Sequence, residues 1–379
     1  MRTPWRRRTR VCPHCLRTLS RERLAYVCAG RPACADDRAL ASADPWAGSA
    51  VCGTCGRTTT RLRCTACDGR LPEGYLRTPG RLVALVGPVG SGKSTYIGVL
   101  LHELLHGLGA ELDAALLPCD DTTVLAYHER YARHLYEERH TVPETAGHDT
   151  GRPLVHRLGR VRRGRFGRAR ERVLTLVFLD TAGGHFASRE HLETRLRYLA
   201  AADAVIVLLD PRDLPGAPVP GGAGVPGRSG EVLARVLAHL GGGGKVTVPV
   251  AVALTKADLL WPHLPEHSPL HRARRPGPVF DADDRAAVHA ELRALLRRWQ
   301  EHQLDARLAR FCTDYQLFAV SMLGAAPRRD GGLGLGGVVR PHRVEDPLMW
   351  LLHRFGALDR ERKGSGDARL PWRRGGGEP

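Results

Sequence analysis

Five short apolar segments recur along most of this chain, and they constrain its fold more than any other feature. They are RLVALV (81–86), RVLTLVFL (172–179), DAVIVLL (203–209), VPVAVAL (248–254) and LFAVS (317–321). Stretches of helical composition separate these segments. Continuous apolar strands that alternate with helices are typical of a parallel sheet covered on both faces. We therefore expect an α/β domain of three layers with a mostly parallel sheet.

The first apolar segment leads into a glycine-rich turn. The turn GPVGSGKS (87–94) matches GxxxxGK[ST] and lies between a strand and a helix, the context in which this pattern binds phosphates. Glycines let backbone N–H groups surround phosphate oxygens, and the helix that follows adds its positive N-terminal end. Lys93 would reach the β- and γ-phosphates, and Ser94 would give its hydroxyl to Mg²⁺. The expected nucleotide contacts of this turn are Gly87, Gly90, Ser91, Gly92, Lys93, Ser94 and Thr95.

The second apolar segment ends in an acidic motif, LVFLDTAGG (176–184). Asp180 would follow a strand beside the first one, where the Mg²⁺ of a nucleotide lies, and would hold the metal through water. The Gly183 N–H would meet the γ-phosphate. After a phosphate-binding turn and a strand, this DxxG pattern is a strong indication of a nucleoside-triphosphate site.

A third motif identifies the base. The sequence VALTKADLL places Thr255, Lys256 and Asp258 at the end of another strand. A carboxylate can accept hydrogen bonds from both the N1–H and the exocyclic amine of guanine, whereas adenine offers no such pair of donors, so the Asp258 carboxylate favours GTP over ATP. The Lys256 stem would lie along the base. Ser321 follows the last segment, where a backbone N–H would contact the guanine O6.

Taken in this order, the motifs GxxxxGK[ST], DTAGG, TKAD and SML resemble those of the Ras-like GTPases of the P-loop superfamily, over about residues 80–356. The cysteine-rich N-terminus and the segment VEDPLMWLLHRFG (344–356) further resemble bacterial double-GTPase-type proteins. The resemblance implies a switch that GTP and Mg²⁺ order and that hydrolysis to GDP releases. It also implies a protein partner, which for the double-GTPase type would be a companion GTPase.

Two departures from the Ras-like pattern bear on catalysis. Gly184 stands where Ras-like enzymes carry the glutamine that orients the attacking water. His185 either reaches that water or is an exposed histidine without a catalytic role, so we expect slow hydrolysis, with a non-hydrolysing GTP-dependent scaffold as the alternative. For the switch threonine that closes on Mg²⁺ we choose Thr145. The other candidates are Thr122, Thr123, Thr141 and Thr150.

Eight of the ten cysteines lie within the first 67 residues. One group in the sequence is Cys12, Cys15, Cys28 and Cys34, and the other is Cys52, Cys55, Cys64 and Cys67. A CxxC pair places two thiolates on one metal ion, and four thiolates complete a closed tetrahedral zinc site. We expect two structural Zn²⁺ sites, one for each group. Pairing across the groups, as in cross-braced modules, and a redox role for the CxxC pairs are the alternatives.

These motifs divide the chain into three expected regions. Residues 1–77 would form a small zinc-ribbon-like module, residues 80–357 the P-loop GTPase domain with its insertions, and residues 358–379 a disordered tail. Residues 152–172 carry nine arginines and one acid. This insertion indicates either a solvated hairpin or a contact surface for an anionic partner.

The net charge of +17 comes almost entirely from arginine, a skew typical of a GC-rich bacterial genome. Genome bias weakens the argument from charge to a nucleic-acid partner. The basic N-terminal arm beside the zinc sites would suit a GTP-regulated nucleic-acid-binding protein, but the region has few aromatic residues for base stacking, which favours a protein partner. No segment reaches the length of a membrane span and no signal peptide opens the chain, so we expect a cytoplasmic protein.

Overall fold

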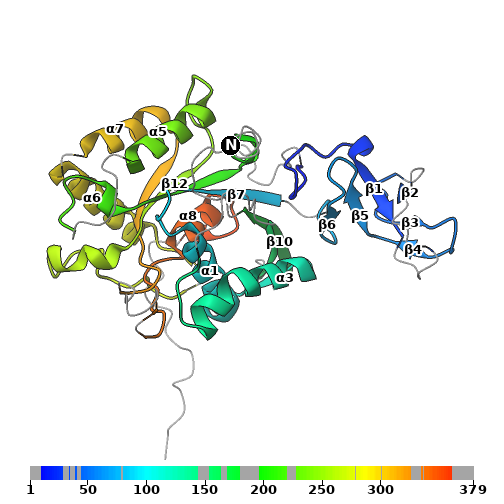
Figure 1. The fold of residues 1–379 in the computed structure, drawn as a ribbon, viewed down its shortest axis with the longest axis horizontal. Helices are drawn as coiled ribbons and strands as arrows, with labels where there is room; N and C mark the ends of the chain where they lie inside the picture. The colour runs from blue at the N-terminus through cyan, green and yellow to red at the C-terminus, as the bar shows by residue number, and fades with distance from the viewer. Residues whose placement is uncertain are drawn as a thin grey trace, which may run out of the picture.

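The computed structural model describes most of the chain. The described residues are 10–28, 34, 39–40, 44–77, 80–143, 153–163, 169–179, 196–219, 228–277, 279–299, 301–325, 334–335 and 337–360. They form a seven-stranded central sheet with helices on both faces and a smaller β-rich module at the N-terminal side (Figure 1). None of the helices among these residues is long and apolar enough to cross a membrane.

The central sheet has the order β14-β12-β11-β7-β10-β9-β8. Its strands are β7 (Gly80–Val86), β8 (Ala114–Pro118), β9 (Leu154–Arg163), β10 (Ala169–Leu179), β11 (Ala204–Leu209), β12 (Val250–Leu254) and β14 (Tyr315–Ala319). Five of them are parallel, and β9 and β8 add antiparallel neighbours at one edge. The mostly parallel sheet that the apolar segments predict is confirmed. The arginine-rich insertion contributes to a hairpin, β9–β10.

Helices cover both faces of the sheet because its central strands are apolar on both sides. On β11, Val205 and Val207 belong to one apolar core, and Ile206 and Leu208 belong to the other. The first core packs under three helices, α5 (Arg228–Gly241), α6 (Ala282–Arg298) and α7 (His302–Phe311). The second packs under α1 (Lys93–Glu103) and α8 (Asp346–Arg354). This gives the expected three layers.

A helical insertion lies between α1 and β9. It contains η3 (Leu104–Leu108), α2 (Gly109–Glu111), β8, α3 (Asp121–Tyr127) and the π-helical segment η4 (His128–Glu137). Gly98 of α1 allows η4 to approach closely, since a Cβ at this position would lie 2.8 Å from the Tyr131 Cβ. The segment η4 therefore packs directly on the helix that follows the glycine-rich turn.

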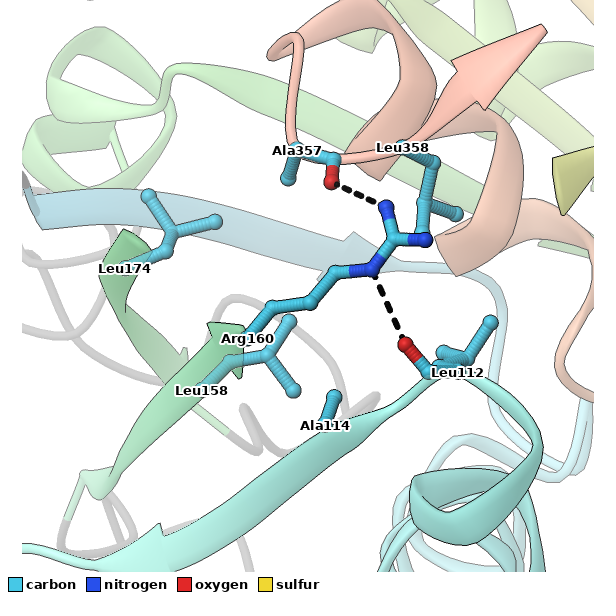
Figure 2. Close-up of a pocket in the computed structure, with 7 residues that line it drawn as sticks. All are labelled: Leu112, Ala114, Leu158, Arg160, Leu174, Ala357 and Leu358. Carbon is cyan, nitrogen blue, oxygen red and sulfur yellow. Dashed lines mark hydrogen bonds between the residues drawn. The ribbon is translucent and has the colours of Figure 1, made fainter. Parts of the chain in front are cut away.

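Arg160 of β9 joins three segments that are far apart in the sequence (Figure 2). Its Nε donates to the Leu112 carbonyl at 2.9 Å, and its Nη1 donates to the Ala357 carbonyl at 3.1 Å. The apolar side chains of Leu158 and Leu358 line the same pocket as Arg160. The chain as far as Leu358 is thus part of the central domain. Directly after Leu358, β15 (Asp359–Arg360) pairs in parallel with β13 (Val279–Phe280).

The N-terminal region up to residue 77, which we call the cysteine module, has short strands. Its four-stranded sheet has the order β2-β1-β5-β6, and β3 pairs with β4. The strands are β1 (Leu24–Val27), β2 (Ala39–Leu40), β3 (Ala50–Val51), β4 (Thr58–Thr59), β5 (Leu62–Cys64) and β6 (Arg70–Leu71). Its core is continuous with one face of the central sheet, because Tyr75 and Leu76 pack in the same cluster as Leu82 and Val155.

Candidate functional site

The glycine-rich turn connects β7 to α1 in the geometry that its sequence predicts. A Cβ at Gly87 would lie 2.6 Å from the Ser91 Oγ and 2.7 Å from the Leu208 carbonyl oxygen, so only glycine fits there. Gly92 has φ 86° and precedes α1, and it has no side chain that could occupy the N–H groups of the first helical turn. The result is a helix N-terminus that faces a turn of backbone, which is an anion-binding arrangement.

Lys93 lies inside this turn. Its side chain is buried, and its Nζ donates to the carbonyls of Gly87 at 3.0 Å and Pro88 at 2.8 Å. The Ser91 hydroxyl also donates to the Pro88 carbonyl, at 2.8 Å. A buried ammonium group at a helix N-terminus is suited to phosphate, because a phosphate oxygen can replace the carbonyls that Lys93 now contacts.

The TKAD motif meets this turn although it is far away in the sequence. The Lys256 Nζ donates to the Gly90 carbonyl at 2.9 Å, across 166 positions of the chain. The same nitrogen donates to the Asp210 Oδ2 at 2.5 Å. Thr255 is fully buried and its hydroxyl donates to the Leu209 carbonyl at 3.1 Å, so Thr255 fixes the end of β12 to β11.

Asp258 is held by the loop after β14. The Ser321 hydroxyl donates to the Asp258 Oδ1 at 2.6 Å, and the Gly324 N–H donates to the Ser321 Oγ at 3.1 Å. Met322 of this loop touches the phosphate turn, since a Cβ at Gly92 would lie 2.6 Å from the Met322 Cε. The three motifs therefore converge at the carboxyl ends of β7, β12 and β14.

The backbone of Ser321 is already paired. Its N–H donates to the His342 carbonyl at 3.0 Å, and the His342 N–H donates back at 2.8 Å. An N–H for the guanine O6 would therefore have to come from the residues that follow Ser321. Sequence analysis could not anticipate this pairing, because His342 lies far along the chain.

A buried ion-pair network supports the backbone pairing of Ser321 with His342. Asp346 is 1% exposed and accepts a hydrogen bond from the Arg343 Nε at 2.7 Å, and Arg285 of α6 also contacts it. The segment that carries Asp346 is the one that resembles double-GTPase proteins. Through the contact of Asp346 with Arg343, this segment fixes the position of His342. The backbone pairing of His342 with Ser321 in turn fixes the Ser321 loop.

Asp210 is a candidate functional residue that the sequence analysis missed. It lies at the end of β11 and is 4% exposed. Burial disfavours its ionised form, yet the contacts with Arg212 and Lys256 outweigh burial and hold the pKa of the Asp210 carboxyl below its usual range. An acid directly after a buried strand, beside two other motif-bearing strand ends, was the available signal.

Several predicted residues lie outside the described part of the chain. They are Thr145, Thr150, Asp180, Gly183, Gly184 and His185. Their roles stay predictions. Among the described threonines, Thr123 is buried and its hydroxyl accepts a hydrogen bond from the Val155 N–H at 3.3 Å, whereas Thr122 is exposed and Thr141 is half-buried. The Thr123 hydroxyl is thus committed to the fold.

The eight clustered cysteines form two groups of four in space. One group is Cys12, Cys15, Cys64 and Cys67, and the other is Cys28, Cys34, Cys52 and Cys55, with the sulfur atoms of each group within 4.8 Å of one another. Grouping by sequence proximity was therefore wrong, and pairing across the groups is correct. The arrangement is nested: the first and last pairs meet, and the two middle pairs meet. Antiparallel pairing of β1 with β5, which aligns Leu24 with Cys64, is the physical reason.

Both cysteine groups fit a tetrahedral zinc ion. The Sγ–Sγ distances are 3.7 Å for Cys12–Cys67, 3.9 Å for Cys15–Cys64 and 3.5 Å for Cys28–Cys55. Four sulfurs at about 2.3 Å from a central ion lie about 3.8 Å apart, so these groups need little rearrangement to bind the metal. Backbone N–H groups of Cys55 and Thr54 lower the pKa of the Cys52 thiol to about 6, which favours the thiolate form that zinc requires.

This chain is similar to several known proteins. The chain is 29% identical over 330 residues to the putative ESX-1 scaffolding and assembly protein SaeC of Mycolicibacterium smegmatis, covering 78% of this chain and 80% of that protein. Two solved structures are similar at low identity. The signal recognition particle receptor SRb-GTP/SRX complex from Chaetomium thermophilum is 17% identical, with 64% of this chain and 90% of that chain covered and a TM-score of 0.30. The Ski7 GTPase-like domain of S. cerevisiae bound to GTP is 16% identical, with 73% and 50% covered and a TM-score of 0.32.

A family model fixes the assignment. The model described as Double-GTPase 2 matches residues 81–315, which is more than half of the chain and includes the phosphate turn, the TKAD motif and the strands that carry them. The resemblance that the motifs suggested is thereby confirmed, as is the P-loop GTPase class of the fold. This chain belongs to the Double-GTPase 2 family.

Proposed function

We propose that this protein is a molecular switch that binds GTP with Mg²⁺, hydrolyses it slowly to GDP and phosphate, and signals its state to a protein partner. The observation that carries the proposal is the position of Asp258 two residues after Lys256, which contacts the phosphate turn at Gly90, with the Asp258 carboxylate oriented by the Ser321 hydroxyl at 2.6 Å. A fixed carboxylate is the group that selects guanine, because it pairs with two donors that adenine lacks.

Binding of the triphosphate would use the turn and the first turn of α1. Lys93 would exchange its contacts with the Gly87 and Pro88 carbonyls for the β- and γ-phosphate oxygens. Ser94 and Asp180 would hold Mg²⁺, which neutralises phosphate charge when it is bound. Thr145 and the Gly183 N–H would respond to the γ-phosphate and so report which nucleotide is present.

Hydrolysis in this proposal is an in-line displacement. The oxygen of a water molecule forms a bond to the γ-phosphorus while the bond to the oxygen bridging to GDP breaks, and the water proton ends on the released phosphate. Lys93 stabilises the charge that develops on the bridging and terminal oxygens. Gly184 offers no side chain to orient the water, so turnover depends on His185 or on a partner and is slow.

A GTP-dependent scaffold that does not hydrolyse its nucleotide is the second candidate. The relative from Mycolicibacterium smegmatis, whose printed name is a putative scaffolding and assembly protein, supports it. Both candidates need a protein partner, and the cysteine module is a suitable docking element. Cysteines clustered in two groups that suit a metal ion are consistent with a reducing compartment such as the cytoplasm.

Nucleotide binding tests the proposal. Nucleotide-free protein with Mg²⁺ should bind GTP and GDP in preference to ATP, and Asp258→Asn should shift that preference toward xanthine nucleotides. We expect the variant to lose at least about tenfold in GTP affinity, since a charged hydrogen-bond partner is removed. Asp113→Asn is the matched control, because Asp113 is exposed and has φ 49°, which asparagine adopts readily.

Single-turnover hydrolysis then separates the two candidates. A rate above that of GTP in buffer supports the switch, and a rate equal to it supports the scaffold. ATP binding equal to or better than GTP binding, unchanged in Asp258→Asn, would refute both.

A further inference from the structure

Asp210 gathers two cations beneath the phosphate turn. Its Oδ2 accepts hydrogen bonds from the Lys256 Nζ at 2.5 Å and from the Arg212 Nη2 at 2.7 Å. The Arg212 Nε lies 3.1 Å from Oδ1 and 3.2 Å from Oδ2, and the Arg212 N–H donates to Oδ1 at 3.0 Å. Arg212 therefore grips both carboxylate oxygens, and it leaves Oδ2 facing Lys256.

The contacts of Arg212 with Asp210 matter because the Asp210 carboxylate is buried. The Asp210 side chain is 6% exposed, whereas those of Arg212 and Lys256 are 29% and 24% exposed. A carboxylate buried to this degree keeps its charge and its orientation only when cationic partners satisfy it. Without Arg212, Asp210 would keep a single cationic partner and would be free to rotate about its side-chain bonds.

Lys256 connects the Asp210 carboxylate to the phosphate turn. Its Nζ bridges the Asp210 carboxylate and the Gly90 carbonyl of the phosphate turn, so the position of its stem is fixed at both sides. Burial lowers the pKa of Lys256 below its usual range, and the neighbouring Asp210 carboxylate opposes this shift. In the proposed function the same stem lies along the guanine base.

The segment that carries Arg212 is firmly supported. Asp213 accepts a hydrogen bond from the Ser229 hydroxyl of α5 at 2.9 Å, and both residues are buried. Gly216 lies against the backbone of Trp299 at the end of α6, since a Cβ there would be 2.0 Å from the Trp299 carbonyl oxygen. The guanidinium is thus held from a rigid loop, and a movement of that loop would be transmitted to Lys256.

The other side of the base site is held separately. Asp258 is oriented by Ser321 and Gly324, and none of these residues contacts Asp210 or Arg212 among the interactions of the described chain. Lys256 and Asp258 are therefore each held by a separate set of partners. Residence of the nucleotide and choice of the base can then be altered one at a time.

We propose that Arg212 is a release latch: through Asp210 it positions Lys256 on the phosphate turn and thereby sets how fast guanine nucleotide leaves, without affecting which base is chosen. The latch rests on the proposed function, because it needs a guanine nucleotide to hold. It makes the loop after β11 the place where a partner could accelerate exchange.

Dissociation of fluorescent GDP and GTP analogues from the full chain tests the latch. Arg212→Ala should raise the dissociation rate of both nucleotides by about tenfold, the loss expected for a charged hydrogen-bond pair. The preference for guanine over xanthine nucleotides should stay at the wild-type value. Arg212→Lys, which keeps the charge but not the two-pronged contact, should raise the rate by a smaller factor.

A double-mutant cycle tests whether Arg212 acts through Asp210. Asp210→Asn should raise the dissociation rate at least as much as Arg212→Ala does, because it also weakens the contact with Lys256. The double variant should add little to Asp210→Asn, because Arg212 then has no carboxylate to hold. Arg235→Ala is the control, since the exposed Arg235 side chain pairs with Glu231 at 3.6 Å on α5, and this variant should release nucleotide at the wild-type rate. Melting of each nucleotide-free variant checks that it is folded.

The outcomes separate the latch from the function on which it rests. Wild-type protein that binds no guanine nucleotide overturns the proposed function. Wild-type protein that binds GDP while folded Arg212→Ala and Arg212→Lys both release it at the wild-type rate overturns the latch alone. Additive effects of Arg212→Ala and Asp210→Asn, or a change in base preference in Arg212→Ala, overturn it as well.

Discussion

The strands of the cysteine module are two to four residues long, whereas those of the central sheet are five to eleven residues long. The central sheet buries continuous apolar strands under helices on both faces, so packing alone can hold it together. The module has two nested groups of four cysteines instead of an extended core. Small domains with so little core usually depend on a metal or a disulfide.

The comparison therefore predicts that the two regions respond to different perturbations. Metal loss should unfold the module and leave the sheet intact. Changes in the sheet should leave the metal in place. The contact between the module and the sheet should respond to both kinds of perturbation.

Removal of metal should have the largest effect. A Cys₄ zinc site contributes about 10–16 kcal/mol of apparent binding free energy, most of which becomes folding free energy of the module. Cys64→Ser should lose one of two zinc ions per chain, and amide hydrogen exchange in the module should approach that of an unfolded peptide. Guanine nucleotide binding by the central domain should persist.

Zinc content by elemental analysis and hydrogen exchange by mass spectrometry measure this outcome. Cys119→Ser is the control, because Cys119 lies outside both cysteine groups and should leave two ions bound. If chelation melts the central sheet together with the module, the two regions form one cooperative unit and the distinction fails.

Acid should destabilise the central sheet through protonation of His156. This residue of β9 is 1% exposed, and burial lowers its pKa to about 4, so the folded state keeps it neutral. The unfolded chain has a histidine pKa near 6.5 and binds more protons than the folded chain below that pH. The stabilisation is therefore complete above pH 6.5 and is lost as the pH falls toward 4, by up to roughly 3 kcal/mol.

Urea denaturation of the central domain between pH 7.5 and 4.5 measures this dependence. His156→Gln cannot titrate and should flatten the slope by the amount assigned to His156, whatever its effect on stability at pH 7.5. Protonation of the cysteines also releases zinc in acid, so zinc content is followed in parallel. An unchanged slope in His156→Gln would assign the acid sensitivity to other groups, among them His102, whose pKa burial also lowers to about 4.

Local patterns in the sequence predicted many residues of the candidate site but few of the contacts between them. The phosphate turn, Lys93, Lys256 and Asp258 could be placed because each follows an apolar strand, and the carboxyl ends of parallel strands meet at one edge. The nested cysteine pairing could not be predicted, because it depends on which strands pair in the module. Asp210 and Arg212 escaped notice for a related reason: their partner, Lys256, is brought to them only by the order of β11 and β12 in the sheet.

The smallest effect concerns the contact between the two regions. The Arg157 Nη2 of β9 donates to the Glu73 carbonyl at 2.7 Å, and Gly74 lies against the same guanidinium. Arg157→Ala should cost only about 1 kcal/mol, the usual net worth of one exposed hydrogen bond with some packing. Because β9 directly follows the segment that holds Thr145, we expect this contact to link the state of the nucleotide to the module.

Hydrogen exchange of residues 70–77 with GTP and with GDP tests that link. In the wild-type protein, exchange should differ between the two nucleotides, and in Arg157→Ala the difference should shrink while nucleotide affinity and zinc content stay the same. Arg298→Ala, at the end of α6, which packs on β14 at the opposite edge of the sheet from β9, is the control and should retain the difference. A wild-type protein in which residues 70–77 exchange identically with either nucleotide would show that the module is a passive neighbour, and the partner would then have to sense the switch from the central domain itself.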